Sequence, residues 1–179
     1  TDVFDAATIQ TRIERLERTA VRGEMPPALL SQTGAFTDLT TLTPAPGVVA
    51  YTPNVAFWSD GALKARWFSL PGGGPADKIA VHGAGNFTFP TGTIFVKQFD
   101  MEMRAGDLTS RKRLETRFLV KTEGGVYGIT YRWRADQSDA DLVPADGADE
   151  RLTIQEKSGP REQTWHYPAQ SECLTCHTE

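Results

Sequence analysis

The chain has 179 residues, of which 39% are hydrophobic and 23% are charged, and it contains 16 glycines and 11 prolines. This balance can bury a core, so it excludes a fully disordered or collagen-like chain, and the length indicates one domain. The formal net charge of -4 argues against nucleic acid as a partner. The apolar runs are short, whereas a membrane-spanning helix needs roughly 20 apolar residues, so the sequence predicts no transmembrane segment.

The first predicted element is an amphipathic helix within residues 1–25. Its apolar residues recur at helical spacing, which places them on one face. These residues are Ile9, Ile13, Leu16 and Ala20. Gly23 and the prolines after it end the helix. We expect residues 26–53, which are rich in Pro, Thr and Ser, to form an irregular segment laid over a core.

From residue 49 onward, β-branched and aromatic residues occur in short runs that are separated by turns with Gly or Pro. The predicted strands are 65–70, 78–82, 93–99, 114–121, 126–134, 152–155 and 163–167. We therefore predict a mainly β fold, either an antiparallel sandwich or a distorted barrel, with one N-terminal helix. The predicted parts are an N-terminal helix (1–25), a β-rich domain (26–168) and a C-terminal segment (169–179).

One hairpin is predicted in particular detail. Residues 117–121 and 126–134 should pair across the turn Glu123-Gly124-Gly125. The second strand alternates, with Tyr127, Ile129, Tyr131 and Trp133 on one face and Val126, Gly128, Thr130 and Arg132 on the other. This alternation is typical of a half-buried antiparallel strand.

The chemistry of the chain is concentrated at its end. Both cysteines lie in the sequence Cys173-Leu174-Thr175-Cys176-His177. Two thiols at this spacing can each form a thioether with a haem vinyl group, and the histidine that follows can bind iron as the proximal ligand. The motif therefore predicts one covalently attached haem c, held by residues 169–179.

Other interpretations of the motif remain open. A thioredoxin-like redox pair also uses Cys-x-x-Cys, but it lies early in a βαβ unit rather than at the end of a β-rich chain. A structural zinc ion needs four ligands, and only His82 and His166 could join the residues of the motif. The cysteines could also form a simple disulfide or remain free thiols.

The start of the chain bears on its location. It begins at Thr1 without methionine or an apolar leader, which indicates either that a signal peptide has been removed or that the chain is a processed piece of a longer one. Haem c is attached outside the cytoplasm, so we expect an exported protein that is periplasmic or extracellular.

Several segments resemble, in order, a poorly characterised bacterial family of exported haem-binding CxxCH proteins. These segments are 31–39, 57–67, 89–93, 114–120, 127–133 and the terminal motif. The resemblance covers roughly residues 26–177 and implies a c-type cytochrome module in which Cys173, Cys176 and His177 attach the haem. Some members of the family are linked to sugar-dehydrogenase-like propellers that use a quinone. Some also have histidine where Gln98 stands and an aromatic residue where His166 stands.

Further residues are candidates for haem contacts. Trp165 and Tyr167 are nearest the motif in sequence and are predicted to pack on the haem. The candidate distal iron ligands are His82, Met101 and Met103, with Met25 and His166 also weighed. A five-coordinate iron and a ligand from another chain remain alternatives. The guanidinium groups of Arg66, Arg132 and Arg134 could pair with haem propionates, or simply be solvated.

These observations together predict an electron-transfer protein whose haem exchanges electrons with a redox partner protein. The partner would be a periplasmic dehydrogenase or neighbouring copies of the same cytochrome. One alternative is a β-sandwich that docks a polysaccharide or a partner enzyme through exposed Trp58 or Trp67. Another is a peroxidase-like enzyme in which His82 serves as the distal acid-base residue.

Overall fold

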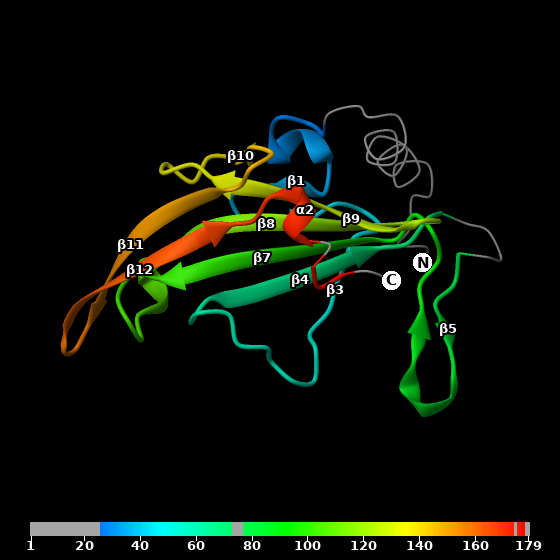
Figure 1. Ribbon diagram of the computed structural model, residues 1–179, viewed down its shortest axis with the longest axis horizontal. Coiled ribbons are helices and arrows are strands. Elements are labelled where there is room, and N and C mark those ends of the chain that lie inside the picture. Colours follow the sequence, from blue (N-terminus) through cyan, green and yellow to red (C-terminus); the bar gives the residue numbers. More distant parts are fainter. Residues whose placement is uncertain (1–25, 73–76, 174, 178–179) are drawn as a thin grey trace.

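The computed structural model describes residues 26–72, 77–173 and 175–177 (Figure 1). The predicted helix in residues 1–25, and Met25 with it, lies outside these residues. The centre of the molecule is a six-stranded antiparallel sheet with strand order β10-β9-β8-β7-β4-β3. The strands of this sheet are β3 (Val49–Ala50), β4 (Leu63–Ser69), β7 (Ile94–Glu102), β8 (Arg111–Thr122), β9 (Gly125–Trp133) and β10 (Ala140–Leu142).

The other strands form three two-stranded antiparallel sheets. These pair β1 (Phe36–Asp38) with β2 (Thr43–Pro44), β5 (Ala80–Val81) with β6 (Phe87–Thr88), and β11 (Ala148–Glu156) with β12 (Gly159–Tyr167). Short helices are the 3-10 turns η1 (Leu30–Thr33), η2 (Gly83–Gly85) and η3 (Leu108–Ser110), and the α-helical turn α2 (Gln170–Cys173). The prediction of a mainly β, antiparallel fold is confirmed, and the described strands close no barrel. Nowhere in the described ranges is there a helix with the length and apolarity to cross a membrane.

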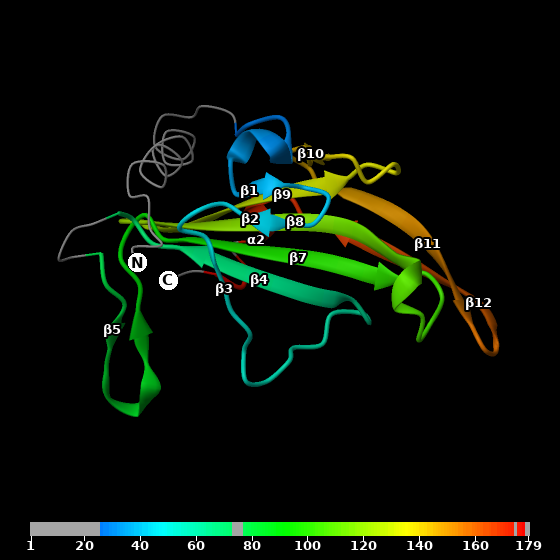
Figure 2. The same cartoon turned by 180° about the vertical axis from the view of Figure 1, so that it is seen from behind.

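Small elements cover the two faces of the central sheet. Figure 2 shows β1, β2 and η1 lying over one face, which we call the β1 face. Figure 1 shows the β11–β12 hairpin and α2 lying over the opposite face, which we call the α2 face. The segment 26–53, predicted to lie over a core, supplies the cover of the β1 face with η1, β1 and β2.

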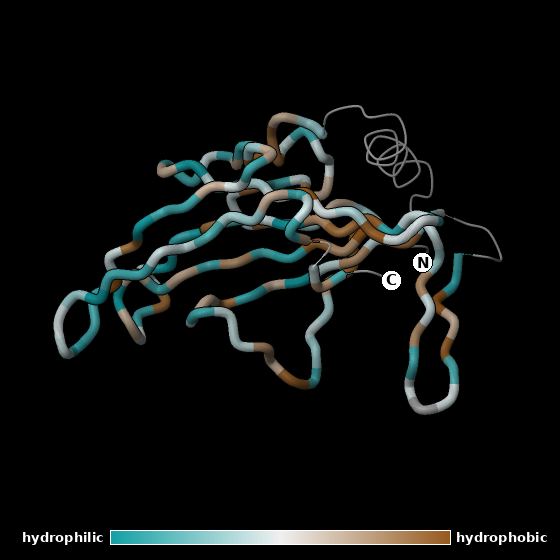
Figure 3. Tube along the Cα trace, viewed as in Figure 1, coloured by the Kyte–Doolittle hydropathy of each residue, from teal (hydrophilic) through white to brown (hydrophobic). Residues whose placement is uncertain are grey.

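The β1 face carries the larger apolar cluster. The predicted alternation of β9 is confirmed, because Tyr127, Ile129, Tyr131 and Trp133 are all buried there. Phe118 and Val120 of β8 lie in the same cluster, and Leu30 and Phe36 of the covering segment pack against them. Hydropathy along the chain follows this arrangement, with hydrophobic stretches where β7, β8 and β9 run side by side (Figure 3).

The opposite face of β9 differs from the prediction. Alternation predicted a solvated face, but Gly128 and Thr130 are buried there. The reason is that α2 packs against β9, while the β11–β12 hairpin covers the neighbouring part of the same face. A second apolar cluster lies under this hairpin and includes Phe99, Leu152 and Trp165. The strand predicted at 152–155 extends to Ala148–Glu156, because β11 pairs with β12 along its whole length.

Candidate functional site

The cysteine motif lies directly against the central sheet. Strand β12 ends at Tyr167, and α2 follows after Pro168 and Ala169, which carries the motif onto the α2 face over β9. Cys173 is half-buried at the end of α2, whereas Cys176 and His177 are exposed. No disulfide joins the two cysteines.

Gly128 of β9 forms the seat for Cys173. A Cβ atom added to Gly128 would lie only 2.3 Å from the Sγ atom and 2.5 Å from the Cβ atom of Cys173. A glycine inside a strand is typical of a place where another part of the chain approaches the backbone closely. Any larger residue here would displace Cys173, so the sheet is shaped for the first cysteine of the motif.

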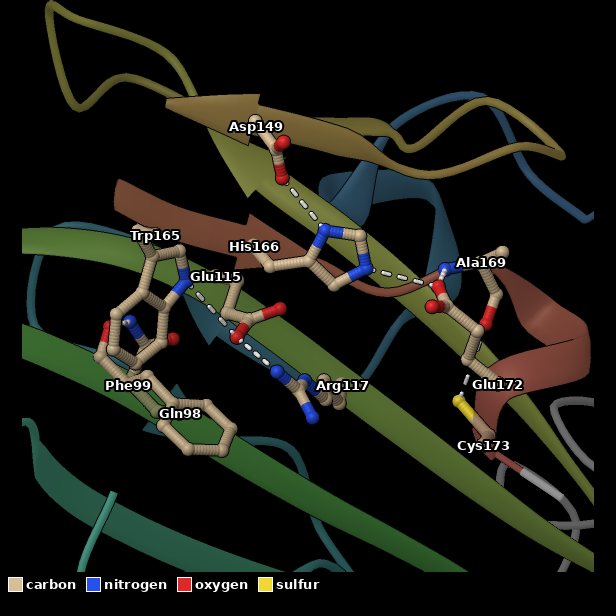
Figure 4. Close-up of polar contacts among 10 residues, drawn as sticks. All are labelled: Gln98, Phe99, Glu115, Arg117, Asp149, Trp165, His166, Ala169, Glu172 and Cys173. Atoms are coloured by element: carbon tan, nitrogen blue, oxygen red, sulfur yellow. Dashed lines mark hydrogen bonds and ion pairs between the residues drawn. The ribbon is translucent and has the colours of Figure 1, made fainter. Parts of the chain in front are cut away.

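A set of polar contacts holds α2 in place (Figure 4). The ring of His166 lies between two carboxylates, with 2.7 Å from Nδ1 to Asp149 Oδ1 and 2.9 Å from Nε2 to Glu172 Oε2. Glu172 also accepts a hydrogen bond from the backbone N–H of Ala169 at 2.6 Å. The hydrogen bonds to Glu172 and Asp149 raise the pKa of His166. Both ring nitrogens of His166, weighed above as an iron ligand, are therefore engaged in anchoring α2.

An apolar row crosses the α2 face beside the motif. Register places Phe68, Phe95, Leu119 and Gly128 opposite one another on β4, β7, β8 and β9. The side chains of Phe68, Phe95 and Leu119 are only partly buried. Phe89 joins them, with its ring centroid 4.8 Å from that of Phe95. An apolar strip thus runs across the sheet from Cys173 to β4.

A cation row lies next to the apolar row, with each cation two residues away from the apolar residue on the same strand. Arg66 of β4 is opposite Lys97 of β7, and Lys97 is opposite Arg117 of β8. Burial, followed by the charges of Arg66 and Arg117, lowers the pKa of Lys97 to about 8. Although His177 is exposed by surface area, partial desolvation and then the charges of Lys97 and Arg117 lower the pKa of its imidazole. This shift favours the neutral imidazole, which is the form that binds a metal.

Unpartnered polar atoms gather on the same face. Three buried side-chain atoms lack a hydrogen-bond partner within the described residues: Glu115 Oε2, Arg117 Nε and Thr130 Oγ1. Glu115 is completely buried, and its other oxygen accepts hydrogen bonds from Arg117 at 2.5 Å and from Trp165 at 3.2 Å (Figure 4). Burial raises the pKa of Glu115. Buried polar groups are normally satisfied, so this concentration of unpartnered atoms marks the α2 face as a candidate binding surface.

The structure places the predicted haem-contact residues in the second apolar cluster. Trp165 is 4% exposed and Tyr167 is fully buried, and the Tyr167 hydroxyl donates to Glu150 at 2.7 Å. Met101 is buried in this cluster, and Met103 packs against it. Met101 lies four residues beyond Lys97, which is about 13 Å at the rise of a strand. Contact of these four residues with a haem stays a prediction.

The remaining candidates lie elsewhere. His82 precedes η2 in the β5–β6 hairpin, with its Nε2 atom 3.0 Å from Thr88 Oγ1. Arg132 is paired with Glu150, and Arg134 with Asp141. Of the three arginines proposed from sequence, only Arg66 lies in the cation row. Within the described ranges, no group of three or more His, Cys, Asp or Glu side chains could hold a metal ion.

Sequence reasoning missed the residues that surround the motif. Gly128 carried a usable signal, since it interrupts a strand of β-branched and aromatic residues. Lys97 and Arg117 lie in predicted strands, but their alignment depends on the register of β7 against β8. Glu115 gave no signal, because its burial results from the β11–β12 hairpin, which comes much later in the chain.

Comparisons with protein-family models, with curated proteins and with solved structures gave no match for this chain.

Proposed function

We propose that this chain is an exported electron-transfer protein that carries one haem c. Thioethers to Cys173 and Cys176 would hold the haem, and His177 would be the proximal iron ligand. The observation that carries this proposal is the seat of Cys173 on Gly128, at the end of the apolar row. A thioether-linked porphyrin needs an apolar surface next to its cysteine, and Leu119, Phe95 and Phe68 offer one on the adjacent strands.

When bound, the haem supplies a one-electron couple between ferric and ferrous iron. The chain's own residues then have distinct tasks. Leu119 and Phe95 would cover the sheet side of the ring with apolar surface, and desolvation followed by the charges of Lys97 and Arg117 lowers the pKa of His177, which favours its neutral form. Glu172 and His166 hold α2, and therefore Cys173, at a fixed place on the sheet. The distal ligand stays a prediction among His82, Met101 and Met103.

The exposure of the motif supports a protein that exchanges electrons with other proteins. Cys176 and His177 are both exposed. We propose that an edge of the haem is accessible to a redox partner protein, either a periplasmic dehydrogenase or a neighbouring copy of the cytochrome.

The test is production of the chain in the periplasm of cells that attach haem c. We expect a haem band that stays with the denatured chain on a gel, and sharp α and β absorption peaks after reduction. Replacement of both cysteines, Cys173→Ser with Cys176→Ser, should abolish the band. A far-red sulfur-to-iron band in the oxidised protein would identify a methionine ligand. A colourless chain, in cells that load a known c-type cytochrome, would overturn the proposal.

A second candidate function is a binding module for a polysaccharide or a partner enzyme. The loop between β3 and β4 exposes Trp58 by 82% and Phe57 by 71%, and Figure 3 shows hydrophobic colour on this loop. Trp67, the other tryptophan proposed for such a surface, is buried in the first apolar cluster and cannot take part. Titration of soluble polysaccharides against tryptophan fluorescence, with Trp58→Ala as the control, tests this function.

A further inference from the structure

We infer that Arg66, Lys97 and Arg117 form a carboxylate-binding site that receives the two propionates of the haem. The inference rests on the proposed function and adds to it how the chain recognises and orients the cofactor. It assigns the cation row to the polar edge of the porphyrin, and the apolar row to the ring.

The positive charges of the cation row are not balanced by nearby carboxylates. Like charges directly opposite one another on adjacent strands destabilise a sheet. Here Lys97 has a cation opposite it on each side. The nearby carboxylate is Glu115, which is already paired with Arg117. A row of three cations facing one carboxylate has an excess of positive charge that a bound anion would neutralise.

The cation row and the strand beside it also hold hydrogen-bond donors that are not used. Among the residues that the structure describes, the Nε atom of Arg117 is buried without a partner. Thr130, opposite Arg117 on β9, is 4% exposed, and its hydroxyl has no partner either. An unpaired buried donor costs free energy that an acceptor would restore. Carboxylate oxygens accept hydrogen bonds only, so they match this set of donors.

The positions of the two rows relative to the cysteine motif match the shape of a haem. The cation row and the apolar row lie side by side on the same face, roughly 7 Å apart along the strands. Cys173 borders the apolar row at Gly128, and Thr130, two residues along the same strand, lies opposite Arg117 of the cation row. Haem has an apolar ring with both carboxylates on one edge. The α2 face presents the same division, with an apolar strip next to a strip of cations.

The test uses the full chain with Cys173→Ser and Cys176→Ser, so that no thioether forms. It is titrated with ferric protoporphyrin IX and with the dimethyl ester of this haem, in which both carboxylates are blocked. We expect the free acid to bind at least about tenfold more tightly than the ester, because charge-assisted hydrogen bonds are lost in the ester. Adding Arg66→Gln and Lys97→Gln should remove this preference.

The matched control is Lys157→Gln with Arg151→Gln, which also removes two positive charges, from exposed positions of the β11–β12 hairpin. It should keep the preference for the free acid. Arg117 is left intact, because its removal would strand the buried carboxylate of Glu115. Circular dichroism and thermal unfolding confirm that each variant is folded.

Each remaining outcome overturns the inference. Equal affinity for the acid and the ester, a preference that survives Arg66→Gln with Lys97→Gln, or no binding of either porphyrin would remove the propionate site. Succinate binding as tightly as haem would assign the row to free dicarboxylates instead. The proposed function fails separately, because it depends on covalent haem in the unmodified chain. A coloured protein without the carboxylate preference would leave the function standing and remove only this site.

Discussion

The two faces of the central sheet bury polar groups in opposite ways. On the β1 face, Gln98 Oε1 accepts hydrogen bonds from Thr116 Oγ1 and from Trp133 Nε1, and its amide nitrogen donates to Asp100 at 2.8 Å. On the α2 face, the buried atoms of Glu115, Arg117 and Thr130 named above have no partner in the described part of the chain. The same strands, β7, β8 and β9, supply residues to both faces.

This difference distinguishes a face whose buried polar network is complete within the chain from a face whose buried polar groups lack partners. The network around Gln98 closes within the described residues and serves to fix the packing of the β1 face. The α2 face instead combines unused donors, excess positive charge and a partly exposed apolar row. In native proteins such departures from internal consistency are expected at functional sites. The contrast therefore supports the proposed site independently of the cysteine motif.

The largest effect is expected from Gly128→Ala. The added Cβ atom would lie 2.3 Å from Cys173 Sγ, so α2 must move off the sheet. We expect a loss of about 1–3 kcal/mol in the free energy of unfolding, as for other overpacked sites, and a sharp fall in covalent haem. Chemical denaturation and haem-stained gels measure the two effects. Gly124→Ala is the control, since a Cβ atom there meets nothing within 4 Å. Equal losses of stability and of covalent haem in the two variants would contradict the close packing of Cys173 on Gly128.

A pair of threonine variants compares the faces directly. Thr116→Val removes a hydroxyl that is hydrogen-bonded to Gln98 and Trp133, which keep their bond to each other, so we expect a loss of about 1 kcal/mol in unfolding free energy. Thr130→Val removes a buried hydroxyl without a partner, so we expect a change within about 0.5 kcal/mol in the haem-free chain. Chemical denaturation of both variants measures the two losses. A larger loss in Thr130→Val than in Thr116→Val would contradict the difference between the faces.

The cation row predicts a pH dependence in the haem-free chain. The pKa of Lys97 is about 8 when folded, against an ordinary value of 10.5. The unfolded chain therefore binds more protons between these values, and stability rises with pH there. Allowing for solvent screening, we expect a gain of about 1 kcal/mol between pH 8 and 10.5. Lys97→Met should lack this gain in denaturation curves recorded across that range. A stability that falls equally in both proteins would refute the prediction.

The smallest effect is expected at the anchor of α2. Because the folded pKa of His166 is raised, its contribution to stability is full below the ordinary pKa of 6.5 and is lost as pH rises through the folded value. His166→Phe should therefore destabilise the chain slightly at pH 6 and not at pH 9. Hydrogen exchange of the α2 amides at the two pH values measures this locally. A difference that does not depend on pH would show that charge plays no part in the anchor.

Much of the fold follows from local patterns, while the site does not. The turn after β8 and the alternation of Tyr127 to Trp133 indicate a hairpin with one buried face. The pairing of β8 with β9 and the burial of that face could therefore be predicted. The burial of Glu115 depends on the late β11–β12 hairpin, and the cation row depends on register across β4, β7 and β8. Such long-range pairing leaves no periodic signal in a single sequence. The motif itself is local, so its cysteines were found, but its seat on Gly128 was not.

If the chain carries the proposed haem, the anchoring of α2 sets an order of events during its attachment. In the docked position Cys173 packs against the backbone of Gly128, and burial raises the pKa of its thiol. A thiol in that state is a poor nucleophile, because the thiolate is the reactive form. A single helical turn held through exposed side chains opens at little cost while the sheet stays intact. Under the proposed function, the enzyme that attaches haem would meet Cys173 in the open form, and closure of this one turn would be the last step of assembly.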